Sequence, residues 1–335
     1  MHESPDERIV NDPHRANPGL EVVVIGGYLG AGKTTLVNHL LREANGQRLA
    51  VMVNDFGEIG IDADLILGQD GEVLQLAGGC ICCTVGSDLV ESLMALAMRQ
   101  PQPDRVLIET SGVALPGQVA RGAALAPGVA IDGVVVMADA QAIRRQCADR
   151  HVGDTVRAQL AQADLLIVNK IEDLSPDTLQ DLLAWLTAQA PRARILTCNE
   201  AQVPSELVLG LRPNDAPTER PAPLARRAAL ARASRGQRPA ASIFDSLSLE
   251  LTEPCELGTL ATGLADPSLG LVRVKGWLRD RQGGRHLLQM VGERWRCTPA
   301  PETESTAGAG RLVLIGLREL MDRERITSIL KQCVS

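Results

Sequence analysis

Short runs of apolar, mostly β-branched residues recur along the first two thirds of the chain, and each is followed by a turn and by apolar residues at helical spacing. Such runs are typical of strands buried on both faces of a parallel sheet. The alternation over residues 20–210 predicts a doubly wound α/β sheet, with function at the carboxyl ends of its strands. The expected strands are residues 22–25, 49–53, 106–109, 133–137, 165–168 and 194–197.

The pattern differs on both sides of this region. Residues 1–19 are polar, and we expect a disordered tail. Residues 211–241 are rich in Pro, Ala and Arg and predict a linker, with a basic helix over 222–234 that docks on an acidic partner as the alternative. Residues 242–335 predict a smaller α+β domain of ferredoxin-like type. Its expected strands are 244–251, 270–278, 287–291, 294–297 and 312–315, its helices 256–264 and 322–333, and its disordered loop 299–309.

The turn after the first strand carries a complete phosphate-binding motif. Residues 27–34 read Gly-Tyr-Leu-Gly-Ala-Gly-Lys-Thr, which matches G-x-x-x-x-G-K-[ST] between a strand and a helix. The glycines let backbone N–H groups point at a β-phosphate. Lys33 would neutralise the β- and γ-phosphates, and the Thr34 hydroxyl would bind Mg²⁺. The predicted nucleotide-binding residues of this loop are Gly27, Gly30, Ala31, Gly32, Lys33, Thr34 and Thr35.

A second strand end suits the same chemistry. Glu109 ends the run at 106–109, and Gly112 follows three residues later. A carboxylate at this position can hold Mg²⁺ through water, and the Gly112 N–H can sense a γ-phosphate.

A later strand ends in Asn169-Lys170, which resembles the guanine-reading motif of GTPases. Glu172 stands where Asp is usual, and Asp173 follows it. Either carboxylate could accept the hydrogen bonds of guanine, so we expect a moderate preference for GTP over ATP. A polar strand-to-helix turn is the alternative interpretation.

Three closely spaced cysteines form the other distinctive motif. Residues 78–83 read Gly-Gly-Cys-Ile-Cys-Cys, so Cys80, Cys82 and Cys83 offer soft thiolate ligands. Buried structural cysteines are the alternative, whereas a disulfide between neighbours would be strained. The other five cysteines are scattered and are expected to be ordinary thiols.

Together these motifs resemble the CobW-type branch of the G3E GTPases, within the SIMIBI class. The resemblance covers residues 20–200 strongly, and residues 274–276 and 312–316 are similar to the family's small C-terminal domain. It implies a GTPase with catalytic roles for Lys33, Asp55 and Glu109 and with GTP, Mg²⁺ and Zn²⁺ as ligands. Zinc is expected at the three cysteines, with Glu58 as an added ligand or switch contact.

The family likeness further implies release of the metal to a client metalloprotein on GTP hydrolysis. Residues 54–84, which join the phosphate loop to the cysteines, would be the switch segment. Co²⁺ or Ni²⁺ in place of Zn²⁺ and a homodimer are compatible with the likeness. Intrinsic turnover should be slow, because no arginine finger is evident near the loops.

The chain also departs from its relatives. Many have Glu-Asn-Glu-Phe-Gly-Glu where residues 53–58 read Val-Asn-Asp-Phe-Gly-Glu, so a carboxylate is absent at Val53 and shortened at Asp55. The His-rich segment of many relatives is missing, and the chain has five histidines. His39, on the helix after the phosphate loop, is expected to have a surface or packing role rather than to bind metal.

Composition limits the function classes. A net charge of −7 argues against nucleic-acid binding, and no apolar run is long enough to span a membrane. The polar, acidic N-terminus is not a signal peptide, and the cysteines do not form a disulfide framework, so we expect a cytoplasmic protein.

Two function classes stay open. One is a nucleotide-hydrolysing metal chaperone; the other is a metal or redox sensor, without transfer activity, in which the nucleotide is a static co-ligand. A small-molecule kinase would need an acceptor pocket that the sequence does not show. Metal affinity that depends on the γ-phosphate separates the chaperone from the sensor.

Overall fold

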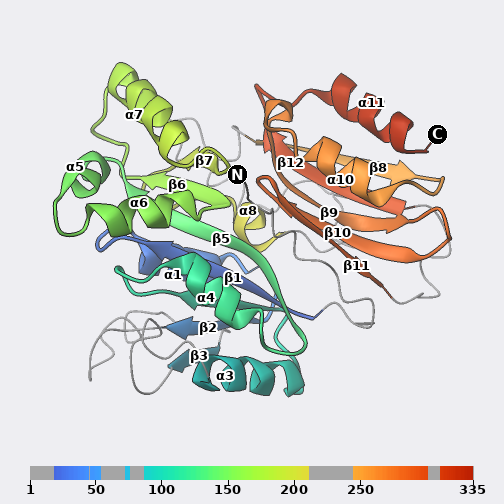
Figure 1. The fold of residues 1–335 in the computed structure, drawn as a ribbon, viewed down its shortest axis with the longest axis horizontal. Coiled ribbons are helices and arrows are strands. Elements are labelled where there is room, and N and C mark those ends of the chain that lie inside the picture. The colour runs from blue at the N-terminus through green and yellow to red at the C-terminus, as the bar shows by residue number, and fades with distance from the viewer. Residues whose placement is uncertain are drawn as a thin grey trace, which may run out of the picture.

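The computed structural model describes residues 19–44, 46–53, 72–75, 87–210, 244–300 and 310–334. These residues build two β-sheets that lie side by side, with helices packed on each (Figure 1). Residues 1–18 of the expected tail, the expected linker at 211–241 and the loop at 301–309 lie outside the described residues.

The first sheet has seven strands in the order β3-β2-β4-β1-β5-β6-β7, and every pair is parallel. This confirms the doubly wound α/β prediction. All six expected strands are present, but β3 was missed, because it lies inside the segment interpreted as a switch. The strands are β1 (Leu20–Gly27), β2 (Leu49–Val53), β3 (Glu72–Gln75), β4 (Arg105–Glu109), β5 (Val129–Asp139), β6 (Leu165–Asn169) and β7 (Arg194–Thr197).

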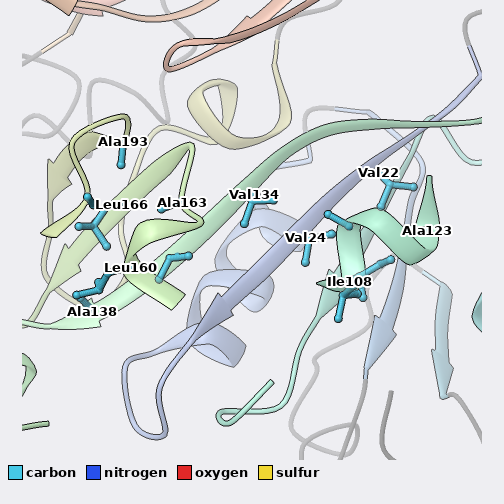
Figure 2. Packing of buried hydrophobic residues seen from close by; sticks show 14 of the residues in the cluster. Val22, Val24, Ile108, Ala123, Val134, Ala138, Leu160, Ala163, Leu166 and Ala193 are labelled. Carbon is cyan, nitrogen blue, oxygen red and sulfur yellow. The ribbon is translucent and has the colours of Figure 1, made fainter. Parts of the chain in front are cut away.

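Seven helices accompany this sheet in the described residues, and they divide unevenly between its faces. They are α1 (Lys33–Arg42), α3 (Ser87–Met98), α4 (Pro116–Ala123), α5 (Ile143–Ala148), α6 (Gly153–Ala161), α7 (Pro176–Gln189) and α8 (Ser205–Leu209). Successive residues of a strand point to opposite faces. Val22, Val24 and Ile108 therefore pack toward α3–α7, as Figure 2 shows for Ala123 of α4 and Leu160 of α6.

The opposite face of the parallel sheet has fewer helices of its own. Val23 and Ile25 pack there against α1 and α8. The same apolar cluster takes in Val272, Val291 and Ile315 from the second sheet. The second sheet therefore completes the cover of a face that α1 and α8 leave open.

The second sheet is antiparallel, with the order β11-β10-β9-β12-β8. Helices α10 and α11 pack on one of its faces, where Leu260 and Ile326 are fully buried. Its elements are β8 (Phe244–Leu251), α10 (Leu257–Leu264), β9 (Leu271–Arg279), β10 (Arg285–Val291), β11 (Arg294–Pro299), β12 (Gly310–Leu317) and α11 (Arg323–Val334).

This sheet differs from the expected ferredoxin-like type. Helix α10 joins β8 to β9 with β12 between them, which is a split βαβ unit. Strands β9, β10 and β11 instead follow one another as hairpins, with Gly283 and Gly292 at positive φ in the turns. A second helical crossover is absent from the described residues, because α11 comes after the last strand.

Charged residues are buried where the two sheets meet. Asp132 accepts hydrogen bonds from Arg105 and from Arg273 of β9. Glu21 accepts from Arg105, and from Lys275 of β9 at 3.0 and 3.2 Å. We call this set the inter-sheet ion cluster; its members are Glu21, Arg105, Asp132, Arg273, Lys275 and Arg296.

The inter-sheet ion cluster lies at the beginnings of β1, β4 and β5. Because these strands are parallel, their carboxyl ends meet at the opposite edge of the sheet. The inter-sheet ion cluster therefore joins the second sheet to the amino-terminal ends of these strands. The phosphate loop lies at their carboxyl ends.

Candidate nucleotide-binding site

The phosphate loop is shaped by glycines that no other residue could replace without strain. Gly27 and Gly32 have φ of 128° and 105°, in the left-handed region. A Cβ would lie 2.2 Å from the Met137 carbonyl oxygen at the first position and 2.6 Å from Asn169 Nδ2 at the second. Gly32 is the N-cap of α1. The first N–H groups of α1 thus face the loop, where they can bind a phosphate.

Thr34 and Glu109 meet beside this loop. The Thr34 hydroxyl donates to Glu109 Oε1 at 2.7 Å, although the residues are 75 positions apart. The contact forms because β1 and β4 are neighbours, with Ile25 opposite Glu109. Two oxygen donors at the end of a phosphate loop suit a hard cation such as Mg²⁺. The residues present therefore fit the expected Mg²⁺ site.

The loop after β4 also closes on the phosphate loop. A Cβ at Gly112 would lie 2.9 Å from the Leu29 backbone nitrogen, so glycine allows this close approach. Buried Gln159 of α6 holds the loop, because its Nε2 donates to Gly112 O at 3.0 Å and to Ala114 O at 2.8 Å. Sequence reasoning missed Gln159, although a lone amide among apolar helix positions was a usable signal.

Asn169 connects the phosphate loop to the loop after β7, which the sequence analysis did not consider. Its Nδ2 donates to Ala31 O at 3.2 Å. Its Oδ1 accepts from the Ala201 N–H at 3.0 Å and from the Cys198 thiol at 3.5 Å. The loop after β7 therefore lies beside the predicted base-reading motif, and Glu200 and Ala201 in it have positive φ.

Lys170 and Glu172 lie at the same strand end. Lys170 has φ of 65°, and its Nζ bonds Asp139 Oδ2 at 2.7 Å. Glu172 is exposed. Burial raises the pKa of Cys198 to about 12, and the negative charge of Glu172 adds to this rise.

The structure brings together the predicted residues of the nucleotide site. Lys33, Thr34, Glu109 and Gly112 lie around the phosphate loop, and Asn169 bonds that loop from the base side. The predicted metal ligands Cys80, Cys82, Cys83 and Glu58, and the predicted catalytic Asp55, lie outside the described residues.

Elsewhere in the described part of the chain, no group of three or more His, Cys, Asp or Glu side chains could hold a metal ion. The five scattered cysteines are buried thiols. His39 packs as expected, because its Nε2 bonds the Val203 carbonyl at 2.6 Å. Within the same residues, no helix has the length and apolar character to cross a bilayer.

Comparison with known proteins gives two family matches. Residues 21–197 match the CobW/HypB/UreG nucleotide-binding domain, and residues 244–334 match the cobalamin synthesis protein CobW C-terminal domain. The zinc chaperone CobW of Sinorhizobium is 29% identical over 354 residues, which is 91% of this chain and 95% of that protein. The zinc chaperone CobW of Pseudomonas aeruginosa is 33% identical over 231 residues, which is 59% of this chain but only 62% of that protein.

A solved structure is also similar in part. Zn(II)-bound YjiA GTPase from E. coli is 21% identical, with a TM-score of 0.42 over 95% of this chain and all of that one. The nucleotide-binding family match alone spans more than half of the 335 residues, and the site geometry agrees with it. The chain therefore belongs to the CobW/HypB/UreG family and is a P-loop GTPase of the CobW type.

Proposed function

We propose that this chain is a GTP-dependent zinc chaperone. It holds Zn²⁺ at Cys80, Cys82 and Cys83 and transfers the ion to a client metalloprotein when GTP is hydrolysed. The names of the CobW relatives support zinc as the cargo. Thiolates also favour a borderline-soft ion such as Zn²⁺ over the hard Mg²⁺.

The observation that carries the proposal is the position of the end of β3, the strand that precedes the cysteines in the chain. β3 runs parallel to β2 and β4, so its end at Gln75 lies at the same sheet edge as Glu109 and the phosphate loop. Three strand spacings separate β3 from β1, or ~14 Å. Cys80 follows Gln75 by five residues, a reach of up to ~17 Å. The thiols can therefore approach a γ-phosphate.

The described residues supply the nucleotide chemistry. Lys33 lies buried at the start of α1, where its charge would offset that of the β- and γ-phosphates. Thr34 and Glu109 would hold Mg²⁺, which supplies further charge neutralisation to the phosphates. The Gly112 backbone lies close to Leu29 and would respond to the presence of the γ-phosphate.

Hydrolysis would then drive release. Loops held by a γ-phosphate relax when it leaves, and the cysteine segment begins at the same sheet edge. If the thiols converge only in the triphosphate state, GTP and zinc must raise each other's affinity by the same factor. A transfer protein needs a factor of about 5–150.

The test is a zinc titration against a competing chelator, with a non-hydrolysable GTP analogue or with GDP bound. We expect tighter zinc binding in the triphosphate state. Glu109→Ala should leave the thiols intact but remove the difference, since Glu109 contacts Thr34 beside the phosphate loop. Equal zinc affinity in the two nucleotide states would refute the chaperone and favour the sensor.

A further inference from the structure

The ends of β5 and β6 are bonded together beside the base-reading motif. The two strands are in register at Asp139 and Asn169. The Asp139 carboxylate accepts from Lys170 Nζ at 2.7 Å, and the Ala140 N–H donates to Asn169 O at 2.9 Å. The Asp139 side chain is only 13% exposed, so water screens this ion pair incompletely.

Lys170 needs such a restraint. Its φ of 65° lies in the left-handed region, which is disfavoured for residues that carry a side chain. The next residue is also fixed, because the Ile171 N–H donates to Asn199 Oδ1 at 2.9 Å. Asp139 therefore holds the motif from the β5 side, while Asn199 holds it from the β7 side.

The residues after the motif are tied to the end of β5 as well. The Asp139 carboxylate also accepts from the Gln141 N–H at 2.9 Å. Gln141 Nε2 in turn donates to Asp173 Oδ2 at 3.1 Å, so Asp139 and Gln141 together hold the turn after β6.

We infer that Asp139 is a positioning residue for the nucleobase, which acts by holding Lys170. The inference rests on the proposed GTP-dependent function but does not involve the metal. Guanine offers N1–H and a 2-amino group to a carboxylate, whereas hypoxanthine offers only N1–H. The ratio of GTP to ITP use therefore reports how well the carboxylate expected after Asn169-Lys170 is placed.

The test replaces Asp139 by Asn and measures steady-state kinetics with GTP and ITP. We expect KM for GTP to rise about 5- to 20-fold with kcat within about 2-fold, because a partly buried charged contact that supports binding is lost. The preference for GTP over ITP should fall as well. A merely structural role would lower kcat or stability and leave that preference unchanged.

Asp181→Asn is the matched control. Its carboxylate pairs with Arg144 at 2.7 Å on the exposed surface of α7, so KM and base preference should not change. If Asp139→Asn does not fold, Asp139→Glu keeps the charge and should show the same KM effect in weaker form. An unchanged KM and GTP/ITP ratio in the folded variant would overturn the role of Asp139. Neither outcome touches the zinc titration of the natural protein, so failure of this inference is distinct from failure of the chaperone proposal.

Discussion

Replacing Asp132 by asparagine removes one of the two carboxylates of the inter-sheet ion cluster. Its side chain has no exposed surface and serves Arg105 and Arg273, each only 3% exposed. The substitution leaves the buried Arg273 guanidinium with a neutral partner, whereas Arg105 keeps its pair with Glu21. Breaking a buried ion pair in this way costs about 3–5 kcal/mol. At about 2–4 °C per kcal/mol for a unit of this size, we expect the Tm to fall by about 6–20 °C.

Calorimetry of three variants tests this reasoning. Asp245→Asn is the control, since its pair with Arg323 is half exposed and should contribute at most about 1 kcal/mol. The double variant Asp132→Leu with Arg273→Met removes both charges, so it should recover most of the loss. If Asp132→Asn melts within about 2 °C of the natural protein, the carboxylate does not stabilise these guanidiniums and the argument is wrong.

The remaining predictions concern acid, the phosphate loop and the thiols. Burial alone would raise the pKa values of Glu21 and Asp132, but the positive charges of the cluster outweigh burial and hold both pKa values below their ordinary range. The two ionised carboxylates therefore stabilise the folded state above about pH 4, and this stabilisation is lost as the pH falls through the lowered pKa values. The Tm should therefore drop between about pH 5 and 2, and less steeply in Asp132→Asn. Gly32→Ala should weaken GTP binding at least about 10-fold in equilibrium titrations, because its Cβ would collide with Asn169; unchanged binding would contradict the loop geometry. Cys82→Ser should weaken zinc binding far more than GTP binding, and equal losses would mean that the two sites share atoms.

The sequence was sufficient to predict the parts of the site whose residues lie close together in the chain. The phosphate loop was predictable because glycine spacing, Lys33 and Thr34 lie within eight residues of one another. The Thr34–Glu109 contact followed from the order of motifs in a parallel sheet. Strand β3 was not predictable, because four residues that read Glu-Val-Leu-Gln carry too little periodicity.

Long-range partners were not readable from the sequence. Nothing in the local sequence distinguishes Asp139, and its role appears only because β5 and β6 pair in register. Gln159 reaches Gly112 across 47 positions. The inter-sheet ion cluster joins β1 to β9 across 254 positions, and no periodicity links Glu21 to Lys275. In each case the contact depends on how elements pack, which a single sequence does not encode locally.

The inter-sheet ion cluster has a consequence for domain exchange. A chimera that joined this parallel sheet to the C-terminal half of another protein would keep Glu21 and Asp132 but lose Arg273 and Lys275. Two buried carboxylates would then have only Arg105 between them. Charged residues on the two halves must therefore change together. The cluster thus restricts the C-terminal halves that can be joined to this GTPase without leaving buried charges unpaired.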